Sequence, residues 1–366
     1  MRGSNVVTKW GTFGIFIIVV GLISCQMGLR KEAPSLDERP AFTFYYQSLD
    51  ALRAGELERA LSQLDSAILL RPNYSQFYCV RGHILQMLNR PDSAISAFEK
   101  CLIYKSYNPE VWLKLGKLYL QQQRYEKAAY YLRKCVAEFP DSIAILLDLG
   151  KAQVLAGHAP LARDALIRYA RKAIALEPEY WKWWGIAHYQ LKNDAEAITA
   201  LRRYADAHPR DVDALRYLGM AYFRAGEYDR GLSYLNRVLQ LQPDDVLVYI
   251  YRARYFMHFE KPHAAREQLE LALAIDSASV AVLLEMGRLF IEQGQFQKAR
   301  PFLEKARYND PQNWQVYKYL GMVFEQENDL ATALEYFTLY LDHTIQRDPD
   351  IEHRLQRLRE ELRKRE

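Results

Sequence analysis

The residue types that most often carry chemistry are not grouped in this sequence as they are in active sites. None of the eight histidines stands in a His-x-x-x-His spacing, and there is no Cys-x-x-Cys pair. His258 and His263 flank one predicted turn, but two imidazoles without carboxylate or thiolate support make a poor metal site. A Gly-rich phosphate loop and a nucleophile elbow are also missing. We therefore expect no catalytic residue, no metal and no cofactor.

The overall charge gives no general case for nucleic-acid binding. The 366 residues contain 49 Lys plus Arg and 45 Asp plus Glu, for a formal net charge of +4. Half of the residues are hydrophobic, which is typical of a folded chain and excludes a disordered one. The placement of the charges therefore matters more than their total.

The chain aligns with itself in frames of about 34 residues, which indicates a repeat protein. The frames start at residues 41, 75, 109, 143, 178, 212, 246, 280 and 314. The eighth residue of each frame is Gly, Ala or Ser, and the twentieth is Ala or Gly, as in the pair Gly219 and Gly231. Two small positions twelve apart predict a helical hairpin whose two helices approach closely. The step from the fourth to the fifth frame is 35 residues, so we expect the regularity of the array to change there.

Large apolar residues surround the small positions at helical spacing. In the third frame they are Trp112, Leu115, Tyr119, Tyr125 and Leu132, and Pro140 closes the frame. This pattern resembles the tetratricopeptide repeat family over residues 41–347. The resemblance implies an all-α, right-handed superhelical solenoid of about nine hairpins that binds proteins and is not an enzyme. Residues 348–366 form one more amphipathic helix, which we expect to cap the array, with a coiled-coil dimerisation helix as the alternative.

Three cysteines fall within the repeats. Cys101 and Cys135 occupy the same column of adjacent frames, where a small apolar side chain fits, and Cys79 makes the number odd. Too few cysteines are present for a disulfide framework in a chain of this length. The sequence therefore predicts buried free thiols and no structural disulfide.

The first 24 residues have the pattern of a signal peptide. Arg2 and Lys9 precede an apolar run over residues 11–22 that is too short to span a bilayer comfortably. The run ends in Leu22-Ile23-Ser24-Cys25, which resembles the lipobox of bacterial lipoproteins. The resemblance implies lipidation of Cys25, with residues 25–40 as the lipidated cysteine and tether. Because Gln26 and not Asp follows, we expect the outer membrane, facing the periplasm, rather than the inner membrane. An uncleaved signal anchor is the alternative.

The resemblance also implies that the first helix of each hairpin lines a concave groove. The fifth and ninth residues of a frame share one helical face. From the third frame to the ninth, each such pair combines one cation with one aliphatic residue or methionine. The cations are Lys117, Lys151, Lys182, Arg216, Arg254, Arg288 and Lys318, and their apolar partners are Leu113, Leu147, Ile186, Met220, Ile250, Leu284 and Met322.

Two interpretations of this row remain open. It binds an extended, acidic and partly hydrophobic segment of a partner protein, or its cations are solvated or neutralised by Glu110, Glu179 and Asp213. In the first case, reversing Arg216, Arg254 and Arg288 to Glu should abolish partner capture with little change in helical content.

Three classes of function fit these features. The leading hypothesis is a lipid-anchored scaffold that assembles a secretion, pilus, motility or outer-membrane biogenesis complex in a bacterial envelope. The second is an adaptor that regulates a cell-wall hydrolase or synthase. The third is a binder of an anionic glycan, which predicts strong salt dependence of binding.

Overall fold

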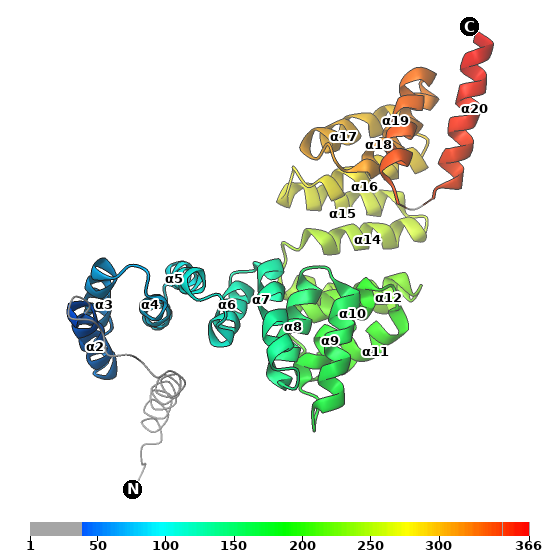
Figure 1. The fold of residues 1–366 in the computed structure, drawn as a ribbon. Helices are drawn as coiled ribbons and strands as arrows, with labels where there is room; N and C mark the ends of the chain where they lie inside the picture. Colours follow the sequence, from blue (N-terminus) through cyan, green and yellow to red (C-terminus); the bar gives the residue numbers. More distant parts are fainter. Residues whose placement is uncertain (1–38, 346, 366) are drawn as a thin grey trace. The chain divides into compact units, whose positions relative to one another are not determined.

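The computed structural model describes residues 39–345 and 347–365. The predictions for the signal peptide, Cys25 and the tether up to residue 38 lie outside the described residues. The described part contains nineteen helices and no strand. Consecutive helices form antiparallel hairpins in sequence order, from blue to red in Figure 1. The predicted all-α solenoid of tetratricopeptide hairpins is confirmed.

Nine hairpins account for all helices but the last. Their first helices are α2 (Arg39–Arg53), α4 (Ser75–Met87), α6 (Pro109–Gln121), α8 (Ile143–Leu155), α10 (Pro178–Gln190), α12 (Val212–Arg224), α14 (Val246–His258), α16 (Val280–Glu292) and α18 (Trp314–Gln326). Their second helices are α3 (Leu57–Leu70), α5 (Pro91–Tyr104), α7 (Tyr125–Glu138), α9 (Ala159–Lys172), α11 (Asp194–Ala207), α13 (Tyr228–Leu241), α15 (Pro262–Ile275), α17 (Phe296–Asn309) and α19 (Leu330–His343). The last helix is α20 (Pro349–Arg365).

The small residues at the eighth position let the two helices of a hairpin meet. A Cβ atom added at Gly219 would lie 2.7 Å from Cγ of Leu235 and 3.1 Å from the carbonyl oxygen of Gly231. The first distance is shorter than real Cβ contacts and the second is unusually tight, so a larger residue would require the helices or the Leu235 side chain to shift. In the first hairpin the eighth residue is Ser48 and not glycine. Its hydroxyl donates a buried hydrogen bond to the carbonyl of Ala60 on the second helix at 2.7 Å.

Each hairpin turn contains one residue with a positive φ angle. In the sixth hairpin this residue is Gly226, with φ of 82°. The next N–H, of Glu227, donates to the carbonyl of Tyr222 at 2.9 Å, which closes the end of the first helix. The residues with positive φ are Gly55, Asn89, Gln123, Gly157, Lys192, Gly226, Glu260, Gly294 and Asn328. The turns therefore share one backbone conformation, which keeps the hairpins equivalent.

The array divides into two compact units between Ala173 and Ile174. This division falls in the connection between α9 and α10, where the frame spacing is 35 residues. Unit 1 contains the hairpins from α2 to α9, and unit 2 contains those from α10 to α19 together with α20.

The helix α20 covers the last hairpin of unit 2. Ile351, Leu355 and Leu358 are buried, and they belong to the same core as the hairpins from α14 to α19. Arg354 pairs with Glu325 of α18 at 2.8 Å, which holds the helix in place. Most of the apolar face of α20 is therefore used inside the chain, which favours the predicted cap over a dimerisation helix.

Candidate functional site

The first helices of neighbouring repeats pack against each other on the inner face of each unit. In unit 1, α6 contacts α8, and in unit 2, α10 contacts α12 while α16 contacts both α14 and α18. The hydroxyls of Tyr189 on α10 and Tyr251 on α14 lie only 3.5 Å apart, although they belong to repeats that are not adjacent. We use the name inner groove for the side chains at the fifth, sixth and ninth positions of the first helices in each unit, where the family resemblance predicts a groove.

Three of the predicted cations are held at the joints between successive repeats of unit 2. Each stands at the fifth position of a first helix and pairs with the aspartate directly before the next first helix or, in the case of Lys318, directly before α20. The pairs are Lys182 with Asp211, Arg216 with Asp245, and Lys318 with Asp348, with closest N···O distances of 2.8, 2.6 and 2.6 Å. These cations therefore connect one repeat to the next.

The aspartate of each joint also caps the helix that it precedes. Oδ1 of Asp211 accepts a hydrogen bond from the backbone N–H of Ala214 at 3.0 Å, and Oδ2 accepts one from the Tyr204 hydroxyl at 3.0 Å. Burial by itself raises the pKa of Asp211, but the hydrogen bonds from Lys182 and Ala214 and the positive charge of Lys182 outweigh it, so the pKa is lowered. The carboxylate is thus stabilised in its charged form.

The joints change what a charge reversal would do. Arg216 keeps only 18% of its side chain exposed, and Asp245 keeps 5%. Arg216 also pairs with Asp213 at 2.8 Å. A glutamate at position 216 would stand between two acids, one of them buried, so it would disturb the fold as well as any partner site. The expectation that this reversal leaves helical content nearly unchanged does not fit the observed burial.

A second cluster of charges lies on α14 and α16. The buried carboxylate of Glu285 pairs with Arg254 of the preceding repeat and with Arg288 of its own helix, the latter at 2.9 Å. Arg288 also lies 3.5 Å from Glu292, whose pKa is raised because burial outweighs the attraction of Arg288. Arg254 retains 41% of its side chain exposed and Arg288 retains 28%. Both side chains therefore keep part of their surface accessible from solvent.

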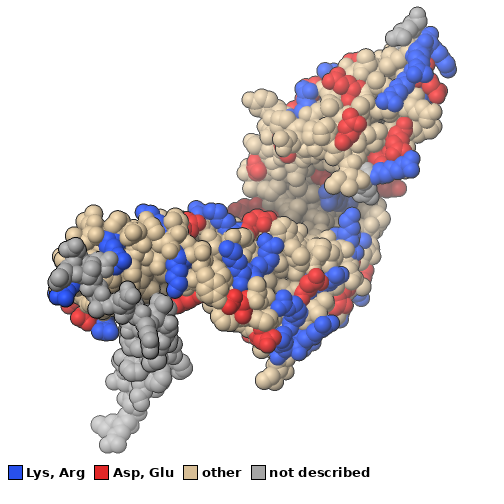
Figure 2. Space-filling view, viewed as in Figure 1, with Lys and Arg blue, Asp and Glu red and all other residues tan. Residues whose placement is uncertain are grey.

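In unit 1 the predicted cations are Lys117 and Lys151. Lys117 lies 3.7 Å from Asp148 and is half-exposed, and Lys151 is half-buried. Of the acids considered from the sequence, Asp213 does pair with cations of the row, whereas Glu110 lies 3.5 Å from His83. Figure 2 shows positive and negative side chains interspersed on the viewed face. The row is thus charge-compensated within the chain, most strongly in unit 2.

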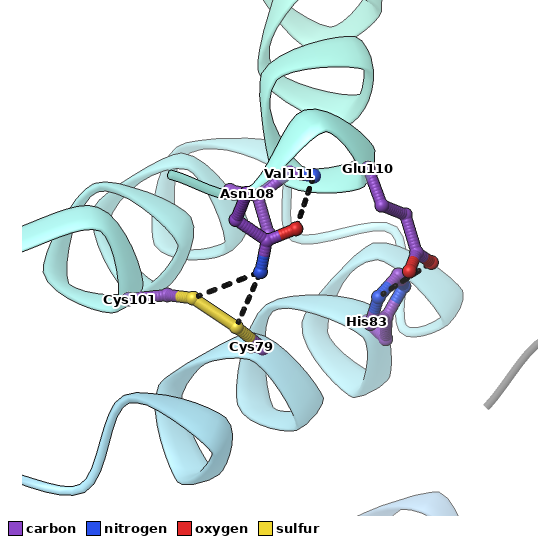
Figure 3. Close-up of a disulfide and its surroundings, with 6 residues drawn as sticks. All are labelled: Cys79, His83, Cys101, Asn108, Glu110 and Val111. Atoms are coloured by element: carbon purple, nitrogen blue, oxygen red, sulfur yellow. Dashed lines mark hydrogen bonds and ion pairs between the residues drawn. A yellow bond between two sulfur atoms is a disulfide. The ribbon is translucent and has the colours of Figure 1, made fainter. Parts of the chain in front are cut away.

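A disulfide joins Cys79 to Cys101 in the second hairpin, and the prediction of no structural disulfide is therefore wrong (Figure 3). The two Cα atoms lie 5.3 Å apart. Cys79 is the fifth residue of its frame and Cys101 the twenty-seventh, and these two positions face each other across a hairpin. The sequence comparison considered Cys101 only with Cys135, which lies in the next repeat. Cys135 is a buried free thiol, as predicted, and burial raises its pKa to about 11.

The disulfide uses two of the three positions that interact at the joints of unit 2, although it joins them within one hairpin. The side-chain nitrogen of Asn108, directly before α6, lies 3.5 Å from Sγ of Cys79 and 3.8 Å from Sγ of Cys101 (Figure 3). The side-chain oxygen of Asn108 accepts a hydrogen bond from the N–H of Val111 at 3.3 Å, which caps α6. Cys79, Cys101 and Asn108 thus correspond by position to Lys182, Tyr204 and Asp211.

The apolar partners of the cations divide into two groups. Leu147, Ile186 and Ile250 are buried and belong to the core. The half-buried ones, which present surface to the inner grooves, are Leu113, Met220, Leu284 and Met322. Methionine side chains adapt well to different partner shapes, so Met220 and Met322 suit a binding surface.

The sequence comparison overlooked the sixth position of the frames. In unit 2 this column places Tyr217, Tyr251 and Tyr319 on the inner groove beside the cations, each of them half-buried. The same column holds Asp148 and Glu285, which neutralise Lys117 and Arg254. A comparison of the sixth residues of the frames, in addition to the fifth and ninth, would have revealed both the tyrosines and the acids.

Two further searches of the described residues gave negative results. No group of three or more His, Cys, Asp or Glu residues in residues 39–345 and 347–365 is arranged to hold a metal ion. No helix in the same ranges is long and apolar enough to cross a membrane.

Comparison with known proteins agrees with the repeat architecture. Two family models, both described as Tetratricopeptide repeat, match residues 45–102, 79–143, 195–246 and 218–280, and residues 120–182 and 257–321. The chain therefore belongs to the tetratricopeptide repeat family. Members of this family generally bind proteins and are not themselves enzymes, which defines the class of this chain.

Individual relatives are distant. BBSome complex member BBS4 of Bos taurus is 25% identical over 84% of this chain, and the chain spans 62% of its length. Type IV pilus assembly protein PilF of Pseudomonas aeruginosa is 30% identical over 34% of this chain, and the chain spans 50% of its length. The solved structure of the APC/C hetero-tetramer Cut9-Hcn1 shares the fold, with a TM-score of 0.54 and 11% identity, over 95% of this chain and 81% of that one.

Proposed function

We propose that this protein is a lipid-anchored tetratricopeptide scaffold that assembles a protein complex in a bacterial cell envelope. The inner grooves of the two units are the partner-binding surfaces, and a protein segment that is acidic and partly hydrophobic is the ligand. The observation that carries this proposal is the combination of accessible cations with half-buried apolar and aromatic side chains on the first helices.

The seven cations of the row divide into those held at the joints and those with accessible surface, and this division narrows the set of residues proposed to bind the partner. Lys182, Arg216 and Lys318 hold the joints, so they contribute little to partner binding. Lys117 in unit 1 and Arg254 and Arg288 in unit 2 keep accessible surface, and each stands beside half-buried apolar or tyrosine side chains. A partner carboxylate would share these cations with their internal acids, while its apolar groups would contact residues such as Met220 and Tyr217.

Several features support an envelope location. The Leu22-Ile23-Ser24-Cys25 sequence follows a short apolar run, as in bacterial lipoproteins. Disulfides persist mainly in oxidising compartments, and the Cys79–Cys101 bond fits such a compartment. One of the relatives described above is a type IV pilus assembly protein, and the pilus is one of the envelope systems considered from the sequence.

Partner binding is tested with neutralised and matched variants of the full chain. Lys117→Gln with Arg254→Gln should weaken capture of envelope proteins, and Arg133→Gln with Lys305→Gln, which are exposed on second helices, should not. Glu285 keeps Arg288 as a partner, so the fold should survive the first pair of changes. An acidic peptide from a captured protein, titrated against the wild type, should bind more weakly as salt increases. Equal capture by both variants would refute the groove as the binding surface.

The anchor is tested independently. The wild-type protein should incorporate a fatty-acid analogue at Cys25 and sediment with membranes, and Cys25→Ala should do neither. Equal labelling of the two proteins would exclude lipidation at this residue without affecting the groove.

A further inference from the structure

Large apolar side chains are exposed along one edge of unit 1, away from the inner groove. They lie at the carboxyl ends of the second helices α3, α5 and α7 and in the connections that follow. We call this surface the apolar edge, and it consists of Leu69, Leu70, Ile103, Tyr104, Tyr107 and Phe139, which are between 45% and 83% exposed. Exposed apolar residues scattered singly are ordinary, but a contiguous group indicates an interaction surface.

Contacts link neighbouring parts of the apolar edge. The hydroxyl of Tyr78 donates to the carbonyl of Pro72, directly after α3, at 2.7 Å. The ring of Tyr78 stacks on that of Tyr104 with 5.4 Å between centroids. Tyr107 in turn donates a hydrogen bond to Glu138, the last residue of α7, beside Phe139. These contacts therefore link the connection after α3 to the end of α5, and the connection after α5 to the end of α7.

The charges on this edge differ from those at the same positions in unit 2. The residues directly after α3 and α5 are Arg71 and Lys105, and the connections over residues 71–74 and 105–108 contain no acid. Asp141, after α7, is paired with Lys172. In unit 2 the corresponding connections contain Asp244, Asp276 and Asp310. The connections after α3 and α5 in unit 1 therefore carry basic residues, whereas these connections of unit 2 carry aspartates close to exposed apolar residues such as Ile275 and Tyr308.

We infer that the apolar edge of unit 1 rests on the surface of the lipid bilayer. This inference builds on the proposed anchor at Cys25. The 13 residues from 26 to 38 can span at most about 45 Å, so the first repeats must stay close to the membrane that holds the lipid. Tyrosine is favoured at the boundary between lipid and water, and basic residues are attracted to anionic headgroups. The bilayer would thus orient unit 1 and leave its inner groove open to partners.

The test uses the full-length protein, processed and acylated, in vesicles of equal parts phosphatidylethanolamine and phosphatidylglycerol. Amide hydrogen exchange of residues 71–74 and 105–108 should be severalfold slower in the wild type than in the variant Leu69→Glu, Ile103→Glu, Phe139→Glu. The matched control Leu271→Glu, Ile275→Glu, Tyr308→Glu changes exposed residues of unit 2 and should keep the wild-type protection.

Other occupants give distinct results. Protection that disappears as the protein is diluted in the vesicles indicates a second copy, and protection of the unprocessed chain without vesicles indicates its own residues 11–22. Either result overturns the inference, as does equal exchange in the wild type and the edge variant. Mass analysis of Cys25 separates the two proposals: an acylated protein with an unprotected edge refutes the docking alone, and a protein without acyl groups refutes the anchor.

Discussion

The joint after the second repeat and the joint after the fifth use the same three positions with different chemistry. In unit 1, Cys79 and Cys101 form a covalent bond and the neutral Asn108 caps the next helix. In unit 2, Lys182 pairs with Asp211, which caps the next helix and accepts a hydrogen bond from Tyr204. The same three positions thus accommodate either a covalent bond beside a neutral cap or an ion pair with a charged cap, so the repeat backbone does not dictate their chemistry.

Because the two joints differ in chemistry, unit 1 should be sensitive to reduction and unit 2 to acid. A disulfide is insensitive to pH near neutrality and to salt, but it is lost on reduction. An ion pair with a capping carboxylate is insensitive to reduction, but it weakens when the carboxylate is protonated. Because stability in a repeat array is a sum of local terms, each condition should affect one unit more than the other.

The largest effect is expected from Arg216→Glu. The new carboxylate would stand against the buried Asp245 and against Asp213, and breaking a buried pair in this way costs about 3–5 kcal/mol. Urea unfolding followed by circular dichroism should show this loss, and hydrogen exchange should locate it in unit 2. Lys305→Glu on the exposed side of α17 is the control, with a change of less than about 0.5 kcal/mol. A small effect of Arg216→Glu would mean that the joints do not stabilise the array.

The next largest effect is expected from removing the disulfide. Cys79 and Cys101 are separated by 22 positions, and closing a loop of this size stabilises a fold by about 3 kcal/mol. The double variant Cys79→Ala, Cys101→Ala should lower the stability of unit 1 and leave hydrogen exchange in unit 2 unchanged. Reduction of the wild type with dithiothreitol should also lower the stability of unit 1. Uniform destabilisation of both units would contradict the local character of the joints.

Acid, unlike reduction, should weaken the carboxylate joints of unit 2 more than the disulfide joint of unit 1. The pKa values of Asp211 and Asp348 are both lowered in the folded protein, where hydrogen bonds and nearby lysines outweigh the effect of burial. A carboxylate whose pKa is lowered by folding stabilises the fold at pH values above its unfolded pKa of about 3.9. This stabilisation is lost as the pH falls from that value through the lower pKa of the folded state. Hydrogen exchange at decreasing pH, corrected for the intrinsic rate, should therefore show opening of unit 2 at those joints before the disulfide joint of unit 1. Simultaneous opening would show that the carboxylates are not the sensitive groups.

The smallest effect is expected from Asn108→Ala. The change removes the side-chain oxygen that accepts from Val111, and loss of such a cap costs about 1 kcal/mol. Thermal unfolding of unit 1 measures this loss, with Asn108→Ser as a control that retains a capping oxygen. Equal melting of the alanine and serine variants would show that the cap contributes nothing beside the disulfide.

The sequence alone determined the repeat, the hairpin and the capping helix. The small residues at the eighth and twentieth positions recur at a fixed spacing because every hairpin needs the same close approach, so the pattern can be recognised without coordinates. The helices start at Ser75, Pro109 and Ile143, where the frames predicted them to start. The lipidation of Cys25 remains a prediction, because it lies outside the described residues.

Only the tertiary structure decided which cations are structural and which cysteines are bonded. Arg216 and Arg254 both belong to the row of cations found in the alignment, but Arg216 is almost enclosed by Asp245 and Asp213, whereas Arg254 keeps 41% of its side chain exposed. Cys101 pairs with Cys79, 22 positions away, and not with its counterpart in the next repeat. The physical reason is that a helical period reports which residues share a face, whereas partners on different helices depend on how those helices cross.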